Sequence, residues 1–435
     1  MLSLQERDRS SRKRENRDLT PSFLLIVVLA LGDVAAAADA LPRVFLLDAA
    51  RLQATRAAIA QHDPAVLPAW GALKADADKA LALERFSVVD KTTTPPSGDK
   101  HDYMTQAPYW WPDPKKPDGL PYIRRDGERN PELDKLADHA AMDRMTSAVA
   151  TLSLAAYLGN DERCGAKAAQ LLRAWFVDPA TRMNPSLTYV QFIPGINTGR
   201  GIGLIETRGL TRVVDAIGLL DSISALPAAD KAALRDWFSQ FLTWMREAPR
   251  GRDESNAKNN HGTYYDLQVV SFALFAEQPT IAKQVIETAR VKRIDAQIEP
   301  DGRQPLELAR TRSFSYSMMN IDGLTQLAII GDRVGVDLWS CTRKGAKAPA
   351  IREALLYLAP YALGDAKWPH RQIGAWDPLS LFPVLRRAAP HYQDDEFRRV
   401  LGRVPPVGAT DWTALTQRQP QQGTERDAIK QEERE

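Results

Sequence analysis

The sequence is poor in the residues that build metal sites and disulfide frameworks. Among its 435 residues are only two cysteines, Cys164 and Cys341, and six histidines. The cysteines match no zinc-site spacing, so they indicate either one disulfide bond or two buried thiols. The histidines are scattered and include no short-spaced pair of the kind that binds zinc on a helix. The sequence therefore gives no reason to expect a metal ion or a cofactor.

A large excess of charge of either sign is also missing. The formal net charge is +2, from 57 Lys and Arg residues against 55 Asp and Glu residues. A balance this even gives no reason to expect a nucleic-acid partner, and a positive groove for another anion would have to come from local clustering. The hydrophobic share of 44% and the charged share of 26% are ordinary for a globular protein with a sizeable core.

No hydrophobic run is long enough to span a bilayer comfortably. The most apolar stretch, residues 23–31, follows a basic stretch at 7–17 and precedes small residues at 35–40. This order predicts a signal peptide over residues 1–40, with an uncleaved signal anchor as the alternative. We expect a periplasmic or secreted mature chain with no stable membrane insertion after signal cleavage.

Alternating strand patterns are absent, and amphipathic helical patterns fill the chain instead. In residues 228–246 one apolar stripe recurs with helical spacing, formed by Leu234, Trp237, Phe238, Phe241, Leu242 and Met245. The sequence predicts an all-α protein. Paired helices favour an (α/α) toroid, an incomplete α/α barrel of about six to seven helical hairpins, over a solenoid, because no fixed repeat is present. We assign the toroid to residues 41–405 and a polar, disordered tail to 406–435.

One polar cluster stands at the start of a predicted helix over residues 260–276. Asn259 and Asn260 are followed directly by His261. Amide N–H groups at a helix N-terminus can bind a carboxylate, and histidine can move protons near neutral pH. The same pattern also fits an asparagine that caps the helix beside a partly buried histidine.

A second cluster combines arginines with a tyrosine. Arg310 and Arg312 lie six and four residues before Tyr316. Nearby positive charge can lower the pKa of a phenol and make it usable as a base. The alternative is an interhelical loop whose arginines pair with helix C-termini or with surface carboxylates.

Two long irregular segments, residues 90–129 and 184–208, are expected to carry function, because loops of this length in a compact domain commonly do. The first contains Tyr109, Trp110 and Trp111, which no helical periodicity explains. These rings can stack on sugar faces, or they can pack the loop onto the helices.

Four regions of the chain together resemble the alginate-lyase superfamily of polysaccharide lyases. They contain NNHG at 259–262, RTRSFSY at 310–316, DYM, APYWWPDP and GLPYIRRDG between 102 and 127, and GRG and IETR between 199 and 208. The similarity covers roughly residues 60–400, with polysaccharide lyase family 38 nearest and family 5 more distant. The resemblance implies an α/α toroid with an open groove for a polyuronate chain.

The resemblance also implies roles for single residues. Asn260 would bind and neutralise the uronate carboxylate, and His261 would accept a proton or add a contact to that carboxylate. Tyr316 would act as base, acid or both, and Arg310 would hold the tyrosine and the carboxylate in place. Arg312 competes with Arg310 for this role. Substrate contacts are expected from Arg312, Glu206, Arg208, Tyr109, Trp110, Trp111, Tyr265 and Arg124.

The function that follows is cleavage of a uronic-acid polymer, alginate (polymannuronate) or a glucuronan, by β-elimination. Neutralising the carboxylate stabilises the negative charge that develops as the C5 proton leaves, and a positioned tyrosine serves proton transfer. The alternatives are a glycoside hydrolase, which needs two carboxylates such as those of Glu206, Glu299, Asp301 and Glu307, and a non-catalytic polysaccharide-binding protein of the periplasm.

Overall fold

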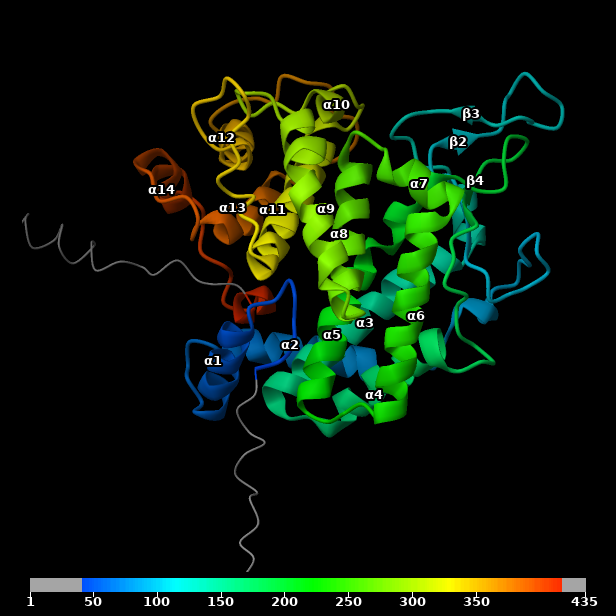
Figure 1. Ribbon diagram of the computed structural model, residues 1–435, viewed down its shortest axis with the longest axis horizontal. Helices are drawn as coiled ribbons and strands as arrows, with labels where there is room; N and C mark the ends of the chain where they lie inside the picture. Colours follow the sequence, from blue (N-terminus) through cyan, green and yellow to red (C-terminus); the bar gives the residue numbers. More distant parts are fainter. Residues whose placement is uncertain (1–40, 417–435) are drawn as a thin grey trace, which may run out of the picture. The chain divides into compact units, whose positions relative to one another are not determined.

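The computed structural model describes residues 41–416. The predicted signal peptide and residues 417–435 of the predicted tail lie outside this part. The described chain contains fourteen α-helices (Figure 1). Their bounds are α1 (Ala49–Ala60), α2 (Leu67–Leu81), α3 (Asp138–Gly159), α4 (Glu162–Leu172), α5 (Leu210–Ser222), α6 (Ala228–Glu247), α7 (Pro249–Ser255), α8 (Asn260–Phe275), α9 (Pro279–Ala289), α10 (Pro305–Leu308), α11 (Ser313–Val334), α12 (Ala350–Ala362), α13 (Leu381–Ala388) and α14 (Asp395–Gly402).

The prediction of an all-α protein is confirmed. Within residues 41–416, strands are limited to β1 (Met104–Gln106), β2 (Trp110–Trp111), β3 (Ile123–Arg124) and β4 (Tyr189–Phe192). β1 pairs with β4 in parallel, and β2 pairs with β3 as an antiparallel hairpin. These strands lie in the two segments that the sequence marks as long irregular loops, and they fix those loops to each other.

The helices pack in two layers. In one layer α3, α5, α8, α11 and α13 each contact the next helix in the row. In the other layer α4 packs on α3, α6 and α9 pack on α8, and α12 packs on α11. This order of paired helices agrees with the predicted α/α architecture.

The two layers differ in how much of each helix is buried. In α6 the predicted stripe, including Leu234, Phe238 and Phe241, is buried, while the opposite face is exposed. α8 is buried along nearly its whole length, including its polar residues. Buried polar groups need hydrogen-bond partners. The ion pair of Asp266 with Arg293 from the π-helical turn after α9 supplies one such partner, with nitrogen–oxygen distances of 2.7 and 3.0 Å.

Two further predictions are settled by the described chain. Cys164 and Cys341 are both buried and unpaired, so they are two buried thiols. The prediction of a disordered tail is wrong for its first part, because a 3₁₀ turn at Trp412–Leu415 packs on α2. Leu415 is buried there, and its carbonyl accepts a hydrogen bond from Thr55 at 3.0 Å. Between residues 41 and 416, no helix combines the length and apolar character that crossing a membrane requires.

Candidate active site

The predicted catalytic residues meet where α8 and α11 begin. Asn260 contacts Glu307 of α10, and the Glu307 carbonyl accepts from the Arg310 N–H at 3.1 Å. Arg310 in turn contacts Tyr316, which contacts Tyr109. Figure 1 shows α7, α10 and the β2–β3 hairpin toward the same upper end of the helices. The structure therefore brings the Asn260–His261 cluster and the Tyr316 cluster into one site.

Asn260 is the first residue of α8 and is fully buried. Its backbone N–H donates to Glu307 Oε1 at 2.6 Å, and its side-chain Nδ2 lies 2.9 and 2.8 Å from the two Glu307 oxygens. The sequence predicts a carboxylate receptor here, and the structure contains one, but the carboxylate it holds is the chain's own Glu307. Burial raises the pKa of Glu307, although the hydrogen bonds from Asn260 oppose that shift. Asn260 Oδ1 has no hydrogen-bond partner within residues 41–416.

His261 follows on the same turn and is mostly buried. Its Nδ1 lies 3.0 Å from Oε1 of Glu254, at the end of α7, whose side chain is 1% exposed. Burial raises the pKa of Glu254, and the neighbouring His261 acts against that shift. A histidine whose Nδ1–H is held by a carboxylate presents the lone pair of Nε2 to the other side. Glu254 Oε2 has no hydrogen-bond partner in the described chain.

Gly262 shows why this motif contains a glycine. A Cβ atom at this position would lie 2.2 Å from both the Ala257 carbonyl oxygen and Arg293 Nη1. Arg293 donates to the carbonyl oxygens of Ala257 and Ser255 at 2.6 and 2.8 Å, which fixes the turn before α8. The close approach of Arg293 to the backbone therefore sets where Asn260 and His261 stand.

Tyr316 lies one turn into α11, with its hydroxyl 2.8 Å from the Tyr109 hydroxyl. The Arg310 guanidinium lies over the Tyr316 ring, 4.0 Å from its centre. The sequence predicts a lowered phenol pKa, and this is wrong for the free protein. Burial, together with the adjacent Tyr109, raises the pKa of Tyr316 more than Arg310 lowers it. Tyr316 is therefore protonated before substrate binds.

Arg310 is already paired with the β2–β3 hairpin. Its Nη2 and Nε lie 2.8 and 3.2 Å from the two carboxylate oxygens of Asp126. Arg124 Nη2 also donates to Asp126 at 2.7 Å, with its side chain 55% exposed. Burial would raise the pKa of Asp126, but the hydrogen bonds and charge of Arg310 hold it well below the usual value. This pair fixes the hairpin, and with it Tyr109, against α11.

Two arginines of the site have a buried nitrogen without a partner. Arg200, just before the 3₁₀ segment η4 (Gly201–Gly209), donates through Nη2 to Gln191 Oε1 at 2.7 Å, while its buried Nε has no partner within residues 41–416. Burial and the nearby positive charge of Arg124 lower the pKa of Arg200 to about 10. Arg312, at the N-cap of α11, likewise has an unpartnered Nε.

Three predicted substrate-binding residues have contacts of another kind. Tyr265 is buried in the core, where its hydroxyl donates to the Met245 carbonyl at 3.0 Å. Glu206 is buried and accepts hydrogen bonds from Tyr103 and Thr105, both at 2.9 Å, so it anchors the loop around β1. Arg208 is exposed, donates to the Ile205 carbonyl at 3.1 Å, and its charge acts on Tyr264 of α8. For Tyr265 the prediction is wrong, because no polar atom of this side chain is free.

The two tryptophans belong to the hairpin. Trp111 Nε1 donates to the Glu128 carbonyl at 3.0 Å, and Arg125 lies over its ring at 5.0 Å from the centre. Trp110 pairs with Arg124 across the hairpin, and its buried Nε1 has no partner in the described part of the chain. Trp111 is therefore used for packing inside the loop.

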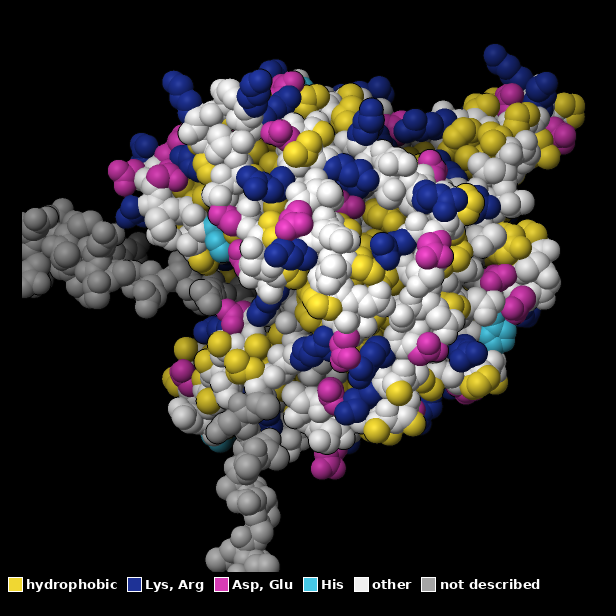
Figure 2. Space-filling view, in the orientation of Figure 1, with side chains coloured by type: hydrophobic (Ala, Val, Ile, Leu, Met, Phe, Trp, Pro, Cys, Tyr) yellow, Lys and Arg dark blue, Asp and Glu magenta, His cyan; other side chains and the backbone are white. Residues whose placement is uncertain are grey.

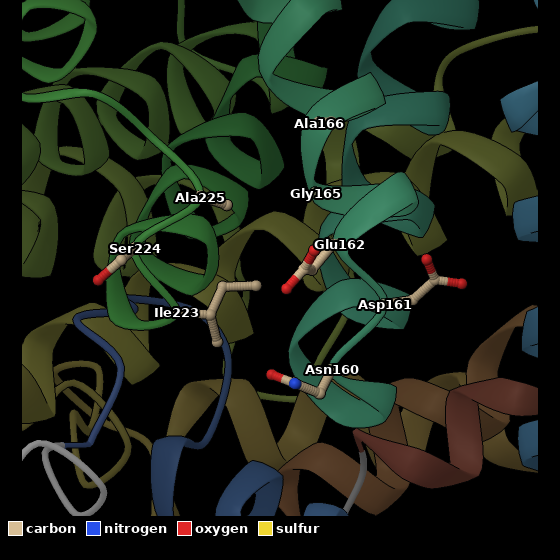
Figure 3. Close-up of a pocket in the computed structure, with 8 residues that line it drawn as sticks. All are labelled: Asn160, Asp161, Glu162, Gly165, Ala166, Ile223, Ser224 and Ala225. Atoms are coloured by element: carbon tan, nitrogen blue, oxygen red, sulfur yellow. The ribbon is translucent and has the colours of Figure 1, made fainter. Parts of the chain in front are cut away.

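The pocket in Figure 3 lies away from this site. It has a volume of about 250 Å³ and is lined by Asn160, Asp161, Glu162, Gly165, Ala166, Ile223, Ser224 and Ala225, around the α3–α4 turn and the end of α5. Asp161 already caps α4 and pairs with Arg163 at 2.8 Å. Figure 2 shows several Lys and Arg side chains over the upper part of the visible face, where α7 and α10 lie.

Sequence reasoning missed Glu254 and did not single out Asp126 or Arg200 as site residues. Glu254 stands in a charged helix that gives no local signal for a buried carboxylate. Arg200 and Asp126 stand inside two of the segments that carry the family resemblance. Their roles depend on contacts with Gln191 and Arg310, which only the fold brings together.

Comparison with known proteins gives matches of one kind. Residues 87–368 match the family model described as alginate lyase. An alginate lyase from Bacteroides ovatus is 40% identical, with a TM-score of 0.82 over 86% of this chain and 99% of that chain. Alginate lyase A1-III from a Sphingomonas species shares the fold at 15% identity, with a TM-score of 0.54 over 86% of this chain and 95% of that chain. A histidine-to-alanine variant of A1-III, complexed with a tetrasaccharide, is 16% identical, with a TM-score of 0.55 over 88% and 98% of the two chains. No curated protein matches.

Proposed function

The chain belongs to the alginate lyase family and is a polysaccharide lyase, and on this premise we propose that it cleaves alginate, or a related uronic-acid polymer, by β-elimination at the site around Tyr316 and His261. The observation that carries the proposal is that Asn260 and His261 begin α8 while Tyr316 lies one turn into α11, and that Thr263 of α8 donates to Asn320 of α11 at 2.7 Å, which holds the two helix starts together. Arg310 and Tyr109 contact Tyr316 there. The finer assignment to polysaccharide lyase family 38 stays a prediction.

The reaction needs three things from the protein. A base removes the C5 proton of the uronate, an acid protonates O4 as the C4–O4 bond breaks, and a positive or hydrogen-bonding group stabilises the carboxylate as charge spreads into it. The electron pair of the C5–H bond becomes the C4–C5 double bond. No oxidant and no water enters the step, so side chains alone can supply the chemistry.

The surroundings of Tyr316 and His261 favour a different role for each side chain. Tyr316 holds its proton, because burial and Tyr109 raise its pKa, and this suits the acid that protonates O4. His261 is held through Nδ1 by Glu254, which leaves the Nε2 lone pair for the C5 proton. Arg310, fixed by Asp126, keeps Tyr316 in place and stabilises the tyrosinate after its proton has left.

A hydrolase on the same fold is the competing reaction. It needs two carboxylates that flank the scissile bond. Of the candidate carboxylates, Glu206 accepts hydrogen bonds from Tyr103 and Thr105 through one oxygen, and Glu307 accepts from Asn260 through both. The other two, Glu299 and Asp301, are surface carboxylates that both pair with Arg303. A pure binding protein would need no buried histidine–carboxylate pair such as His261 with Glu254. Both alternatives are therefore less well supported than the lyase.

The test is a screen of polymannuronate, polyguluronate, glucuronan and hyaluronan as substrates. A lyase product contains a double bond conjugated with the carboxylate, so ultraviolet absorbance rises together with new reducing ends. New reducing ends without absorbance would identify a hydrolase, and neither signal on any polyuronate would contradict the proposal.

We also propose that residues 1–40 direct export and are removed, which places the enzyme in the periplasm or outside the cell, where polymeric substrates are met. The basic, apolar and small-residue order of this segment supports the proposal. N-terminal sequencing of protein recovered from the periplasm or the medium tests it, and an intact residue 1 in that fraction would contradict cleavage.

A further inference from the structure

The start of α11, which carries Tyr316, is not capped by its own N-cap residue. That residue is Arg312, and its side chain makes no capping hydrogen bond within the described chain. Ser, Thr, Asp and Asn are the residues that usually accept from the first free N–H groups of a helix. The N–H groups of Ser313 and Phe314 donate instead to a segment that lies 58 residues further along the chain. The cap of this helix is therefore a long-range contact.

The segment that supplies this cap is the strap, residues 364–377, which follows α12 and contains no helix. It runs antiparallel to the residues that lead into α11. The Ile373 N–H donates to the Thr311 carbonyl at 2.8 Å, and the Ser313 N–H donates to the Arg371 carbonyl at 3.2 Å. The backbone of the strap therefore fixes the backbone at the entry to α11.

Gln372 is the strap residue that binds this helix start through its side chain as well as its backbone. Its Oε1 accepts from the Phe314 N–H at 3.0 Å, and its Nε2 donates to Ser315 Oγ at 3.1 Å. Its backbone pairs with that of Arg312, whose carbonyl accepts from the Tyr316 N–H at 3.0 Å. Gln372 therefore contacts both residues that directly precede Tyr316, and it pairs with the residue that receives the Tyr316 N–H.

The strap also fixes the rotation of α11 about its own axis. Phe314 is 1% exposed, and its ring meets the rings of Trp368 and Trp376 edge-on, at centroid distances of 5.1 and 4.3 Å. Two steps along an α-helix turn the chain by about 200°, so Phe314 and Tyr316 point to nearly opposite sides. Holding Phe314 between the two tryptophans therefore directs Tyr316 away from the strap, toward Tyr109.

We propose that Gln372 is a positioning residue for Tyr316, an inference that rests on the proposed role of Tyr316 in the elimination. Gln372 acts through the Phe314 N–H and the Ser315 hydroxyl, and it holds the start of α11 at the depth and rotation that the reaction needs. A misplacement of about 1 Å in a reacting group can cost about 10²-fold in rate. Tyr109 and Arg310 contact the Tyr316 side chain, whereas the strap holds the backbone around it, so substitutions can separate the two supports.

The experiment compares two substitutions of Gln372 that have nearly equal size and differ in hydrogen bonding. Gln372→Met removes both side-chain hydrogen bonds, so kcat on the best polyuronate should fall at least about tenfold, with KM changed less than about twofold. Gln372→Glu can still accept from the Phe314 N–H and from the Ser315 hydroxyl, so its kcat should return to within about threefold of wild type. Gln278→Met is the control, because it removes the hydrogen bond of another partly buried glutamine, to Ser239 at 3.3 Å at the start of α9, and should keep wild-type kcat.

Hydrogen exchange of the peptide that spans residues 311–316 gives a readout that does not depend on turnover. The backbone N–H groups of this peptide should exchange faster in Gln372→Met and at the wild-type rate in Gln278→Met. Faster exchange together with wild-type kcat would make Gln372 a structural cap and would overturn the proposal. A loss that appears in KM alone, or a lower kcat with unchanged exchange, would mean that Gln372 acts on the substrate and would overturn it as well.

Failure of this proposal and failure of the lyase function are distinguishable. If the wild-type chain produced no ultraviolet absorbance from any polyuronate, the lyase function would fall, and the positioning role of Gln372 with it. If the wild type were active and Gln372→Met were equally active, or if Gln372→Glu were as slow as Gln372→Met, the positioning role alone would fall.

Discussion

The starts and the bodies of α8 and α11 are both rich in buried polar groups, but they differ in how these groups are satisfied. In the body of α8, Asp266 and Arg293 engage each other, and Arg293 gives its remaining donors to two backbone carbonyls. Near the helix starts, by contrast, Asn260 Oδ1 and Oε2 of Glu254, at the end of α7, have no partner among the described residues. The buried charges in the body of α8 are therefore hydrogen-bonded to each other, whereas two buried acceptors near the helix starts are not hydrogen-bonded to any described residue.

The difference separates polar groups that hold the fold from polar groups that await a ligand. A saturated buried pair contributes little net stability but is costly to break, because the remaining charge stays buried. An open buried acceptor has a cost that a bound sugar can offset. Substitutions in the bodies of the helices should therefore change stability, and substitutions at their starts should change rate or binding.

The largest expected effect is on rate and separates two tyrosines. Tyr316→Phe should lower kcat by about 10²–10⁴-fold while leaving the unfolding midpoint unchanged, because the proton donor is lost and the ring stays. Tyr265→Phe, on α8, removes only the hydrogen bond to the Met245 carbonyl, so it should keep wild-type kcat and lose about 1 kcal/mol of stability. Initial rates by ultraviolet absorbance and thermal melts check both, and equal activity of the two variants would remove Tyr316 from the mechanism.

The next effect is on stability and tests the buried ion pair of Asp266 with Arg293. Arg293→Met leaves the buried Asp266 without its partner and should lower the free energy of unfolding by about 3–5 kcal/mol. Arg235→Met removes a half-exposed pair with Glu277 at 2.9 Å and should cost less than about 1 kcal/mol. Denaturant titrations measure both. Similar losses would mean that burial does not distinguish these pairs.

Gly262 directly follows His261 and also contacts Arg293, so a substitution there should affect both the site and the buried ion pair. Gly262→Ala forces a methyl group against Arg293 and the Ala257 carbonyl and should cost about 1–3 kcal/mol, with a lower kcat because His261 moves. Gly71→Ala in α2 meets nothing within 4 Å and should be neutral or stabilise by up to about 1 kcal/mol. A harmless Gly262→Ala would show that the turn before α8 can yield.

Sequence reasoning was reliable where one local pattern decides the structure. The stripe of α6 follows from its apolar spacing, and Trp237 and Phe241 are buried as expected. The meeting of Asn260 with the Tyr316 segment could be expected only because the family resemblance joined two distant motifs.

The same reasoning failed where a contact over a long sequence distance decides the outcome. Glu307 accepts a hydrogen bond from the side-chain amide of Asn260, and Asp126 forms an ion pair with Arg310. The pKa of Tyr316 rises because burial and Tyr109 outweigh an arginine that the sequence places beside it. Neither the depth of burial nor the partner from the hairpin is visible in the local pattern.

The smallest expected effect concerns the pair that joins the hairpin to α11 and depends on pH. Arg310 holds the pKa of Asp126 below its usual value, so the charged carboxylate is favoured more in the folded chain than in the unfolded one. A lowered folded pKa stabilises the protein above the unfolded pKa of about 3.9, and this contribution is lost as pH falls below that value. The difference in unfolding free energy between wild type and Asp126→Asn should therefore be constant from about pH 7 to pH 5 and shrink below about pH 4.

Asp134→Asn, which removes an exposed pair with Arg129, provides the control and should change stability less at every pH. Because Asp126 also fixes Arg310 against Tyr316, Asp126→Asn should lower kcat at neutral pH, whereas Asp134→Asn should not. A pH-independent difference for Asp126→Asn would mean that its carboxylate is held by shape rather than by charge. The hairpin would then have a structural role, like the paired groups in the bodies of the helices, rather than a role in the site at their starts.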